Sequence, residues 1–208
     1  MKKLALLLAL ALIFLFSGCL STFYPLYTDK DVVFEPRLVG SWNTGKDGKI
    51  AVFSQSNSAD FANEKPSFQK LAGKAYTVVF KDNEGNELSK YIAALVKIGK
   101  YYYLDYYPSE TNQLKAIEAS YKAHFIKLHV FYRVKFNGND AFEVGQFDES
   151  FLRNLIEKKQ IRIKHEVGFD GSYLITAPTE DLQQYVVKYS DTPEAYYKES
   201  ITTYNKIK

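Results

Sequence analysis

The chain has 208 residues, a formal charge of +3 at pH 7 and one cysteine, Cys19. A charge so close to neutral gives no electrostatic case for a nucleic-acid partner. A single cysteine allows no internal disulfide, so the fold has to be held together by packing alone. The 17 Tyr and 15 Phe favour half-buried sheet surfaces and therefore a β-rich fold.

The first nineteen residues contain a targeting pattern. Two lysines form a basic start, residues 4–16 are an unbroken apolar run, and the small residues Ser17 and Gly18 precede Cys19. This order is typical of a secretory signal peptide. The apolar run is short for a membrane span, which needs roughly 20 residues. A plain signal peptide, or an uncleaved anchor with an incidental cysteine, stays open as an alternative.

The small-small-Cys ending resembles the lipobox of bacterial lipoproteins. The resemblance implies that residues 1–18 are removed and that Cys19 becomes a diacylglyceryl cysteine with a further acyl chain, such as palmitate, on its amino group. Two or more acyl chains give stable membrane anchoring. The residue directly after Cys19 is Leu20 and not Asp, and no acidic cluster follows it. By the same resemblance, this predicts a lipid-anchored protein of the cell envelope, on the inner, periplasmic face of the outer membrane.

The mature chain is expected to have two parts. Residues 19–36 are interpreted as a lipidated tether that lies along the domain surface, since they contain two prolines and little glycine or serine. Residues 37–208 are long enough for one β-rich domain with a substantial core.

Alternating apolar and polar residues predict seven to nine strands in hairpin order. The expected strands cover residues 38–43, 50–54, 75–81, 88–98, 101–107, 124–136, 141–147, 162–167 and 172–176, and residues 200–204 are an option for a further, final strand. Asn137-Gly138 is the strongest hairpin turn signal. Residues 54–71 are expected to be a loop, with a short strand near Phe68 as an option, and residues 114–121 a helical turn or a loop.

Helices are expected only late in the chain. Asp148 is a candidate N-cap for a helix that ends near Lys159, a second helix begins at Thr179, and a short third begins at residues 192–194. The predicted fold is therefore mainly β. It is an antiparallel meander that closes into a barrel or forms a strongly curved sheet, with two or three short helices in the C-terminal third.

Gly40-Ser41-Trp42 resembles the G-x-W signature of lipocalins and lipocalin-like barrels. The resemblance implies that Trp42 plugs the closed end of an up-and-down barrel, and it makes Arg133 a candidate for the arginine that covers this tryptophan. Asp105-Tyr106 resembles part of a second lipocalin motif. The alternative for Trp42 is a generic core aromatic.

A wider resemblance covers nearly the whole mature chain. It rests on Tyr76 and on the segments 25–28, 38–42, 82–85, 103–108, 129–131 and 176–183. Together they are similar to a group of uncharacterised bacterial lipoproteins with a lipocalin-like β region. This resemblance implies the anchor and the β fold, and it transfers no activity and no catalytic residue.

No pattern in the sequence indicates catalysis. The three histidines, His124, His129 and His165, lack the spacing of metal ligands and are interpreted as surface or network residues. No nucleophile elbow and no glycine-rich phosphate loop occur. The protein is therefore expected not to be an enzyme, with no metal and no cofactor apart from the lipid on Cys19.

Four residues are candidates for ligand binding: Trp42, Tyr103, Asp105 and Arg133. Asp105 is either an acceptor at the barrel rim or a structurally satisfied side chain, and the structural interpretation is favoured. The face that carries Arg133 also carries lysines and phenylalanines, which indicates an amphipathic outer face rather than an anion-binding interior.

The leading hypothesis is a membrane-anchored binding module whose barrel holds a small apolar or amphipathic ligand. The alternative is a structural or protein-partner lipoprotein, active in envelope assembly or as an accessory or inhibitor subunit, because some of the many tyrosines must be exposed. A barrel interior filled by side chains would contradict the first hypothesis.

Overall fold

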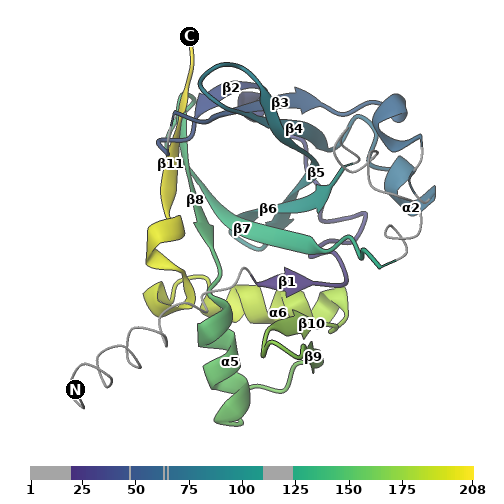
Figure 1. The fold of residues 1–208 in the computed structure, drawn as a ribbon, viewed down its shortest axis with the longest axis vertical. Helices are drawn as coiled ribbons and strands as arrows, with labels where there is room; N and C mark the ends of the chain where they lie inside the picture. The colour runs from purple at the N-terminus through teal and green to yellow at the C-terminus, as the bar shows by residue number, and fades with distance from the viewer. Residues whose placement is uncertain (1–19, 47, 63, 65, 110–123) are drawn as a thin grey trace, which may run out of the picture.

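The computed structural model describes residues 20–46, 48–62, 64, 66–109 and 124–208, which form an eleven-stranded sheet with helices around its outside (Figure 1). The strands are β1 (Ser21–Thr22), β2 (Gly40–Asn43), β3 (Ile50–Gln55), β4 (Tyr76–Lys81), β5 (Glu87–Ile98), β6 (Tyr101–Pro108), β7 (His129–Phe136), β8 (Ala141–Gln146), β9 (His165–Val167), β10 (Tyr173–Ile175) and β11 (Thr202–Lys206). The α-helices are α2 (Pro66–Gln69), α5 (Glu149–Glu157) and α6 (Thr179–Tyr189), and 3-10 helices cover Pro36–Leu38 (η1), Ser58–Phe61 (η2), Pro193–Ala195 (η3) and Lys198–Ser200 (η4).

Eight of the strands close into an antiparallel barrel. Each of β2 to β7 pairs with the strand that follows it, and β11 pairs with both β8 and β2, which completes the ring seen in Figure 1. Short hairpin turns keep sequence neighbours adjacent; Gly99, with φ +59°, supplies the left-handed conformation that the two-residue turn between β5 and β6 requires. The prediction of a mainly β, lipocalin-like barrel is confirmed.

Several local predictions need correction. Strand β9 begins at His165 rather than at residue 162, and β11 covers residues 202–206 rather than 200–204. The first barrel strand begins at Gly40 because η1 occupies the residues before it, and β7 begins at His129 rather than at residue 124. Near Phe68 the chain forms α2 instead of a strand. The loop before it contains η2, which Asn57 and Asp60 stabilise through a reciprocal capping box. Residues 114–121 lie outside the described part of the chain.

The alternation along each barrel strand separates an inner from an outer face, as the sequence predicts for β7. At one end of the barrel the inner face is filled by aromatic rings. Trp42 lies edge-on to Phe142 at 4.7 Å between ring centroids, and Phe142 lies edge-on to Phe53 at 6.0 Å. Leu38 of η1 is fully buried beneath them, and the Trp42 indole donates a hydrogen bond of 2.8 Å to its carbonyl oxygen. Trp42 therefore closes this end.

The cation over Trp42 is Lys206 of β11, not Arg133. The Lys206 ammonium lies 5.2 Å from the Trp42 ring centroid and donates a hydrogen bond of 3.1 Å to the Arg37 carbonyl oxygen. Arg133 points from the outer face of β7 instead, so the expectation that it covers the tryptophan is wrong.

Replacing Lys206 with Met is expected to lower the free energy of unfolding by about 1–2 kcal/mol. The substitution removes a cation–π contact and a charged hydrogen bond, while keeping most of the apolar stem. Urea unfolding followed by the fluorescence of Trp42 measures the change. The exposed Lys74 offers a control, and Lys74→Met is expected to change stability by less than about 0.5 kcal/mol.

Residues 20–36 are more deeply embedded than the expected surface tether. Leu20 and Leu26 are buried in a second apolar core, outside the barrel wall, together with Tyr185 and Val186 of α6. Strand β1 pairs with β7 and with β10, so the segment belongs to the sheet.

Helix α5 begins after Asp148, whose side chain accepts a hydrogen bond from the Ser150 amide, as the sequence predicts for an N-cap.

Candidate functional site: a cavity at the open end of the barrel

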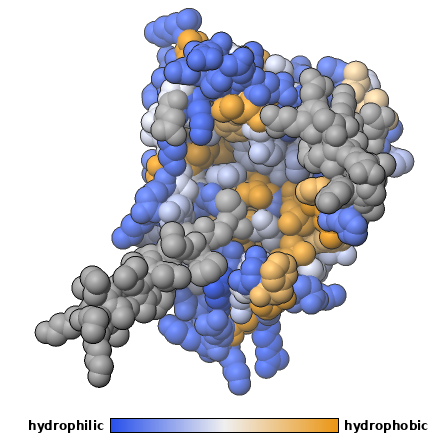
Figure 2. All heavy atoms as spheres, viewed as in Figure 1, coloured by the Kyte–Doolittle hydropathy of each residue, from blue (hydrophilic) through white to orange (hydrophobic). Residues whose placement is uncertain are grey.

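The barrel is hollow at the end opposite Trp42. A cavity of about 550 Å³ occupies this end, within the usual range for small-molecule sites. Its walls include inward-facing residues of six barrel strands, namely Phe80, Tyr91, Tyr106, Val130, Val144 and Tyr204. Figure 2 shows hydrophobic residues around a hollow within the ring of strands.

Tyrosine rings give the cavity its shape. Tyr106 lies edge-on to Tyr91 at 5.7 Å and edge-on to Tyr132 at 5.5 Å between ring centroids, so three strands share one aromatic cluster. Burial raises the pKa of Tyr106 well above its ordinary value and that of Tyr204 to about 12. Both hydroxyls are therefore neutral in any physiological buffer, and the wall combines apolar surface with uncharged polar atoms.

The rim of the cavity is basic. Lys46 and Lys49 lie in the turn between β2 and β3 and line the opening, and of the described lining residues none is Asp or Glu. Lys46 is held in place by a hydrogen bond of 2.6 Å to the Glu199 carbonyl oxygen, which keeps its charge at the mouth. An apolar interior with cations at its edge suits an amphipathic molecule that carries an anionic head.

The structure brings none of the four predicted ligand-binding residues into the lining of this cavity. Trp42 is buried in the aromatic cluster at the closed end. Tyr103, Asp105 and Arg133 occupy alternate positions on β6 and β7 that face outward, beneath residues 20–31 and α6. Sequence reasoning missed the residues on the other face, including Tyr106 and Tyr132, although the alternation on β7 already placed Tyr132 on the apolar side.

Asp105 is buried in the outer wall and not at the rim. One carboxylate oxygen lies 2.7 Å from Nδ1 of His129, and the other accepts a hydrogen bond of 2.7 Å from the Leu26 amide. The two side chains are 0% and 3% exposed. Because Leu26 belongs to the segment that precedes the barrel, this pair fastens that segment to the wall. The structural interpretation of Asp105 and the network interpretation of His129 therefore describe the observed contacts.

Asp31 makes a second attachment of the same segment. Its carboxylate accepts hydrogen bonds from the Thr28 amide and hydroxyl at 2.8 and 2.7 Å, and from the Gln183 side chain of α6 at 2.9 Å. Burial works against the charge, but these hydrogen bonds hold the pKa of Asp31 below its ordinary value.

The contribution of Asp31 to stability is expected to depend on pH in the acid range. A carboxyl whose pKa is lowered by folding stabilises the protein above its unfolded pKa, near 3.9, and loses that contribution as the pH falls through the folded value. The difference in unfolding free energy between the parent and Asp31→Asn should therefore be constant above about pH 5 and shrink below about pH 4. Urea titrations at several pH values measure it; a difference that grows on acidification contradicts the assignment.

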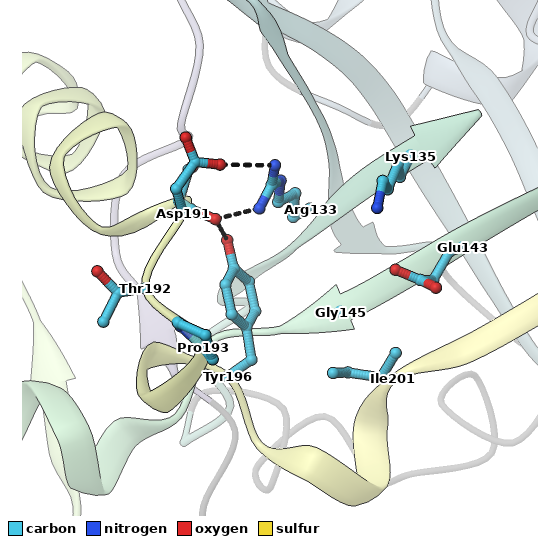
Figure 3. A pocket seen from close by; sticks show the side chains of 10 residues that line it. Arg133, Lys135, Glu143, Gly145, Asp191, Thr192, Pro193, Tyr196 and Ile201 are labelled. Carbon is cyan, nitrogen blue, oxygen red and sulfur yellow. Dashed lines mark hydrogen bonds and ion pairs between the residues drawn. The ribbon is translucent and has the colours of Figure 1, made fainter. Parts of the chain in front are cut away.

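Arg133 completes a cluster at the C-terminal end of α6 (Figure 3). Its guanidinium donates to the Ser190 carbonyl oxygen and to the Asp191 carboxylate, and it lies 4.9 Å from the centre of the Tyr101 ring. A hydrogen bond from Tyr101 and one from Lys100 lower the pKa of Asp191. A cation at a helix C-terminus satisfies its last carbonyl groups, so this cluster attaches α6 to the barrel. The adjoining hollow measures about 250 Å³.

A closed eight-stranded antiparallel barrel with one plugged end and one hollow end defines the chain as a lipocalin-like β-barrel protein. No protein-family model matches the sequence, and comparisons with curated proteins and with solved structures find no match either. The class therefore rests on the architecture alone.

Among the described residues, no group of three or more His, Cys, Asp or Glu side chains is arranged to hold a metal ion. None of the helices in this part of the chain is long and apolar enough to cross a membrane. Cys19, the predicted lipidation site, lies just before the first described residue.

Proposed function

We propose that this chain is a non-catalytic lipoprotein of the bacterial cell envelope, related to the uncharacterised lipoproteins that its sequence resembles, and that its barrel binds one small amphipathic ligand. The observation that carries the proposal is the cavity of about 550 Å³ at the open end of the barrel. An interior packed with side chains would have left no room for a ligand.

The size of the cavity limits the ligand. An eight-stranded barrel is just wide enough to be filled by its own side chains or to hold one small ligand. Here the aromatic cluster around Trp42 takes up the closed half, so the ligand occupies only the half lined by Tyr106, Tyr132 and Tyr204. One short acyl chain or a comparable apolar group fits this description better than a phospholipid with two chains.

The polarity of the cavity sets the orientation of the ligand. The apolar part enters toward Val130 and Val144, and an anionic head stays at the rim beside Lys46 and Lys49. Calorimetric titration of the purified protein with a medium-chain fatty acid is expected to show one saturable site. The matching fatty alcohol should bind about two- to fivefold more weakly, because it lacks an exposed ion pair worth roughly 0.3–1 kcal/mol. Equal affinities for the fatty acid and the fatty alcohol would contradict the placement of an anionic head group beside Lys46 and Lys49.

The anchor is the second part of the proposal. The signal-peptide pattern of residues 1–18 and the lipobox resemblance around Cys19 support attachment to the outer membrane, on its periplasmic face. Cys19→Ala is expected to abolish acylation and to leave an unprocessed precursor. Metabolic labelling with a radioactive fatty acid, followed by membrane fractionation, measures both effects. A Cys19→Ala protein that is still labelled and processed normally contradicts the lipoprotein assignment.

A structural or protein-partner role is the second candidate. It is favoured by Phe125 and Ile126, which precede β7 and are 60% and 64% exposed, since exposed apolar residues side by side are typical of contact surfaces. Cross-linking in intact envelopes separates the two functions. A reproducible protein partner, together with no saturable ligand binding, would favour the partner role.

A further inference from the structure

The structure leaves no linker between the proposed lipid anchor and the folded domain. Leu20 is 2% exposed and packs in the outer core, and Ser21 already pairs with strands β7 and β10. Cys19 is the next residue toward the amino terminus, and consecutive Cα atoms are about 3.8 Å apart. If Cys19 is acylated, as the proposed function requires, the domain has to lie directly on the membrane surface.

The pairing of β1 shows which surface lies at that point. β1 runs parallel to β10, with Ser21 opposite Leu174. Continuing this register by one residue places Leu20 beside Tyr173, which directly follows the turn of the β9–β10 hairpin. The hairpin turn, residues 168–172, therefore lies at the end of β1 where the chain leads to Cys19.

This turn carries an unusually exposed apolar side chain. Phe169 at the tip of the hairpin is fully exposed, and Val167 at the end of β9 is 56% exposed. The neighbouring Asp170 does not project in the same way, because its carboxylate accepts hydrogen bonds of 3.0 and 2.7 Å from the amide and hydroxyl of Ser172. Exposing the apolar side chains of Phe169 and Val167 to water is unfavourable in free energy.

The base of the hairpin is held firmly. The Tyr173 ring stacks on the His165 ring with 5.0 Å between their centroids, and the Arg153 guanidinium of α5 lies 5.0 Å from the centre of the Tyr173 ring. The backbone amide of Tyr173 donates a hydrogen bond to the Glu149 carboxylate. The tip is thus presented by a fixed support beside the chain that leads to the anchor. Apolar side chains held at a membrane surface bury themselves at the boundary between head groups and acyl chains.

We infer that the β9–β10 hairpin is a membrane-docking element, with Phe169 and Val167 inserted into the bilayer interface next to the acyl chains of Cys19. The partner is a lipid bilayer and not a protein, because the acylated residue brings the bilayer to within a few residues of the tip. The docking fixes the orientation of the barrel relative to the membrane instead of leaving it free on a tether.

The single cysteine makes a direct test possible. Acylation consumes the thiol of Cys19, so a cysteine introduced elsewhere in the full-length, membrane-extracted protein is the only free thiol. Phe169→Cys and Val167→Cys place an environment-sensitive fluorophore at the hairpin. Ile126→Cys is the matched control, since its exposure is similar to that of Val167 and it precedes His129, which pairs with Thr22 at the other end of β1. Each labelled protein is reconstituted into phosphatidylethanolamine–phosphatidylglycerol vesicles with and without nitroxide-labelled lipid.

The expected result is loss of fluorescence in nitroxide vesicles for labels at positions 167 and 169, and no loss at position 126. Docking is overturned if the hairpin labels are not quenched, or if position 126 is quenched as strongly. Thiol labelling of the parent protein, which carries no introduced cysteine, distinguishes a failure of docking from a failure of the lipid anchor. A parent that takes up thiol reagent has a free Cys19, which overturns the lipoprotein proposal and removes the ground for docking. A parent that takes up none leaves the quenching result as the test of the hairpin alone.

Discussion

Asp105→Ala is expected to lower the free energy of unfolding by about 3–5 kcal/mol, the range found when one partner of a buried pair is removed. The carboxylate has two buried partners, Nδ1 of His129 and the Leu26 amide, each at 2.7 Å. The substitution leaves both without their acceptor in a site that water does not reach, and each unsatisfied group costs about 1–3 kcal/mol. Urea unfolding followed by circular dichroism measures the loss.

Two further variants test whether the loss of stability comes from the buried partners of Asp105 and not from mutation in general. Asp105→Asn keeps an oxygen that accepts from the Leu26 amide, so it should lose clearly less stability than the alanine variant. Asp29→Ala removes an exposed carboxylate that lies 3.5 Å from Lys70, and it should change stability by less than about 0.5 kcal/mol. An Asp105→Ala protein that loses under 1 kcal/mol would show that the segment before the barrel is not held by this contact.

Val130→Trp is expected to weaken fatty-acid binding by at least about tenfold, which corresponds to about 1.4 kcal/mol. Val130 faces into the open half of the barrel on β7, where it pairs with Tyr106 of β6. An indole at this position occupies space that the ligand would otherwise fill. Because the cavity is empty of protein atoms, the larger side chain needs little rearrangement of the wall, and the fold should survive. Calorimetric titration measures the affinity.

Val187→Trp is the matched control for this substitution. Val187 is 41% exposed on α6, outside the barrel, so the same change in side chain should leave ligand binding unaltered. Urea unfolding of both variants checks that they are folded. Equal affinities of Val130→Trp and the parent would place the binding site elsewhere.

Much of the barrel follows from local sequence. Alternation on β7 predicted which residues face inward, turn residues predicted the hairpins, and Asp148 predicted the start of α5. The sequence does not distinguish a closed barrel from a curved sheet, because the closing pair joins Trp42 and Asn43 to residues 205–206 at the other end of the chain. Local patterns do not contain such long-range pairing.

The site residues show the same limit. Asp105 stands out in the sequence because it lies among tyrosines, but its partner Leu26 is 79 positions away, so no neighbouring residue indicates that Asp105 is buried. Lys206 covers Trp42 from the last strand, and no pattern near either residue predicts this contact. The lysines at the rim lie in a hairpin turn, where charged residues are ordinary, and only the closed barrel brings them to the same opening as Tyr204.

The most direct test of the proposed function uses the position of Trp42. It is the only tryptophan in the chain, and it lies at the closed end of the barrel that holds the cavity. A fatty acid with a dansyl group on its chain is titrated into the purified protein while Trp42 is excited. If the barrel binds the ligand, dansyl emission sensitised by Trp42 rises and saturates at one ligand per protein, and Trp42→Phe removes the signal. Emission that never saturates, or that is unchanged in Trp42→Phe, would contradict binding inside the barrel.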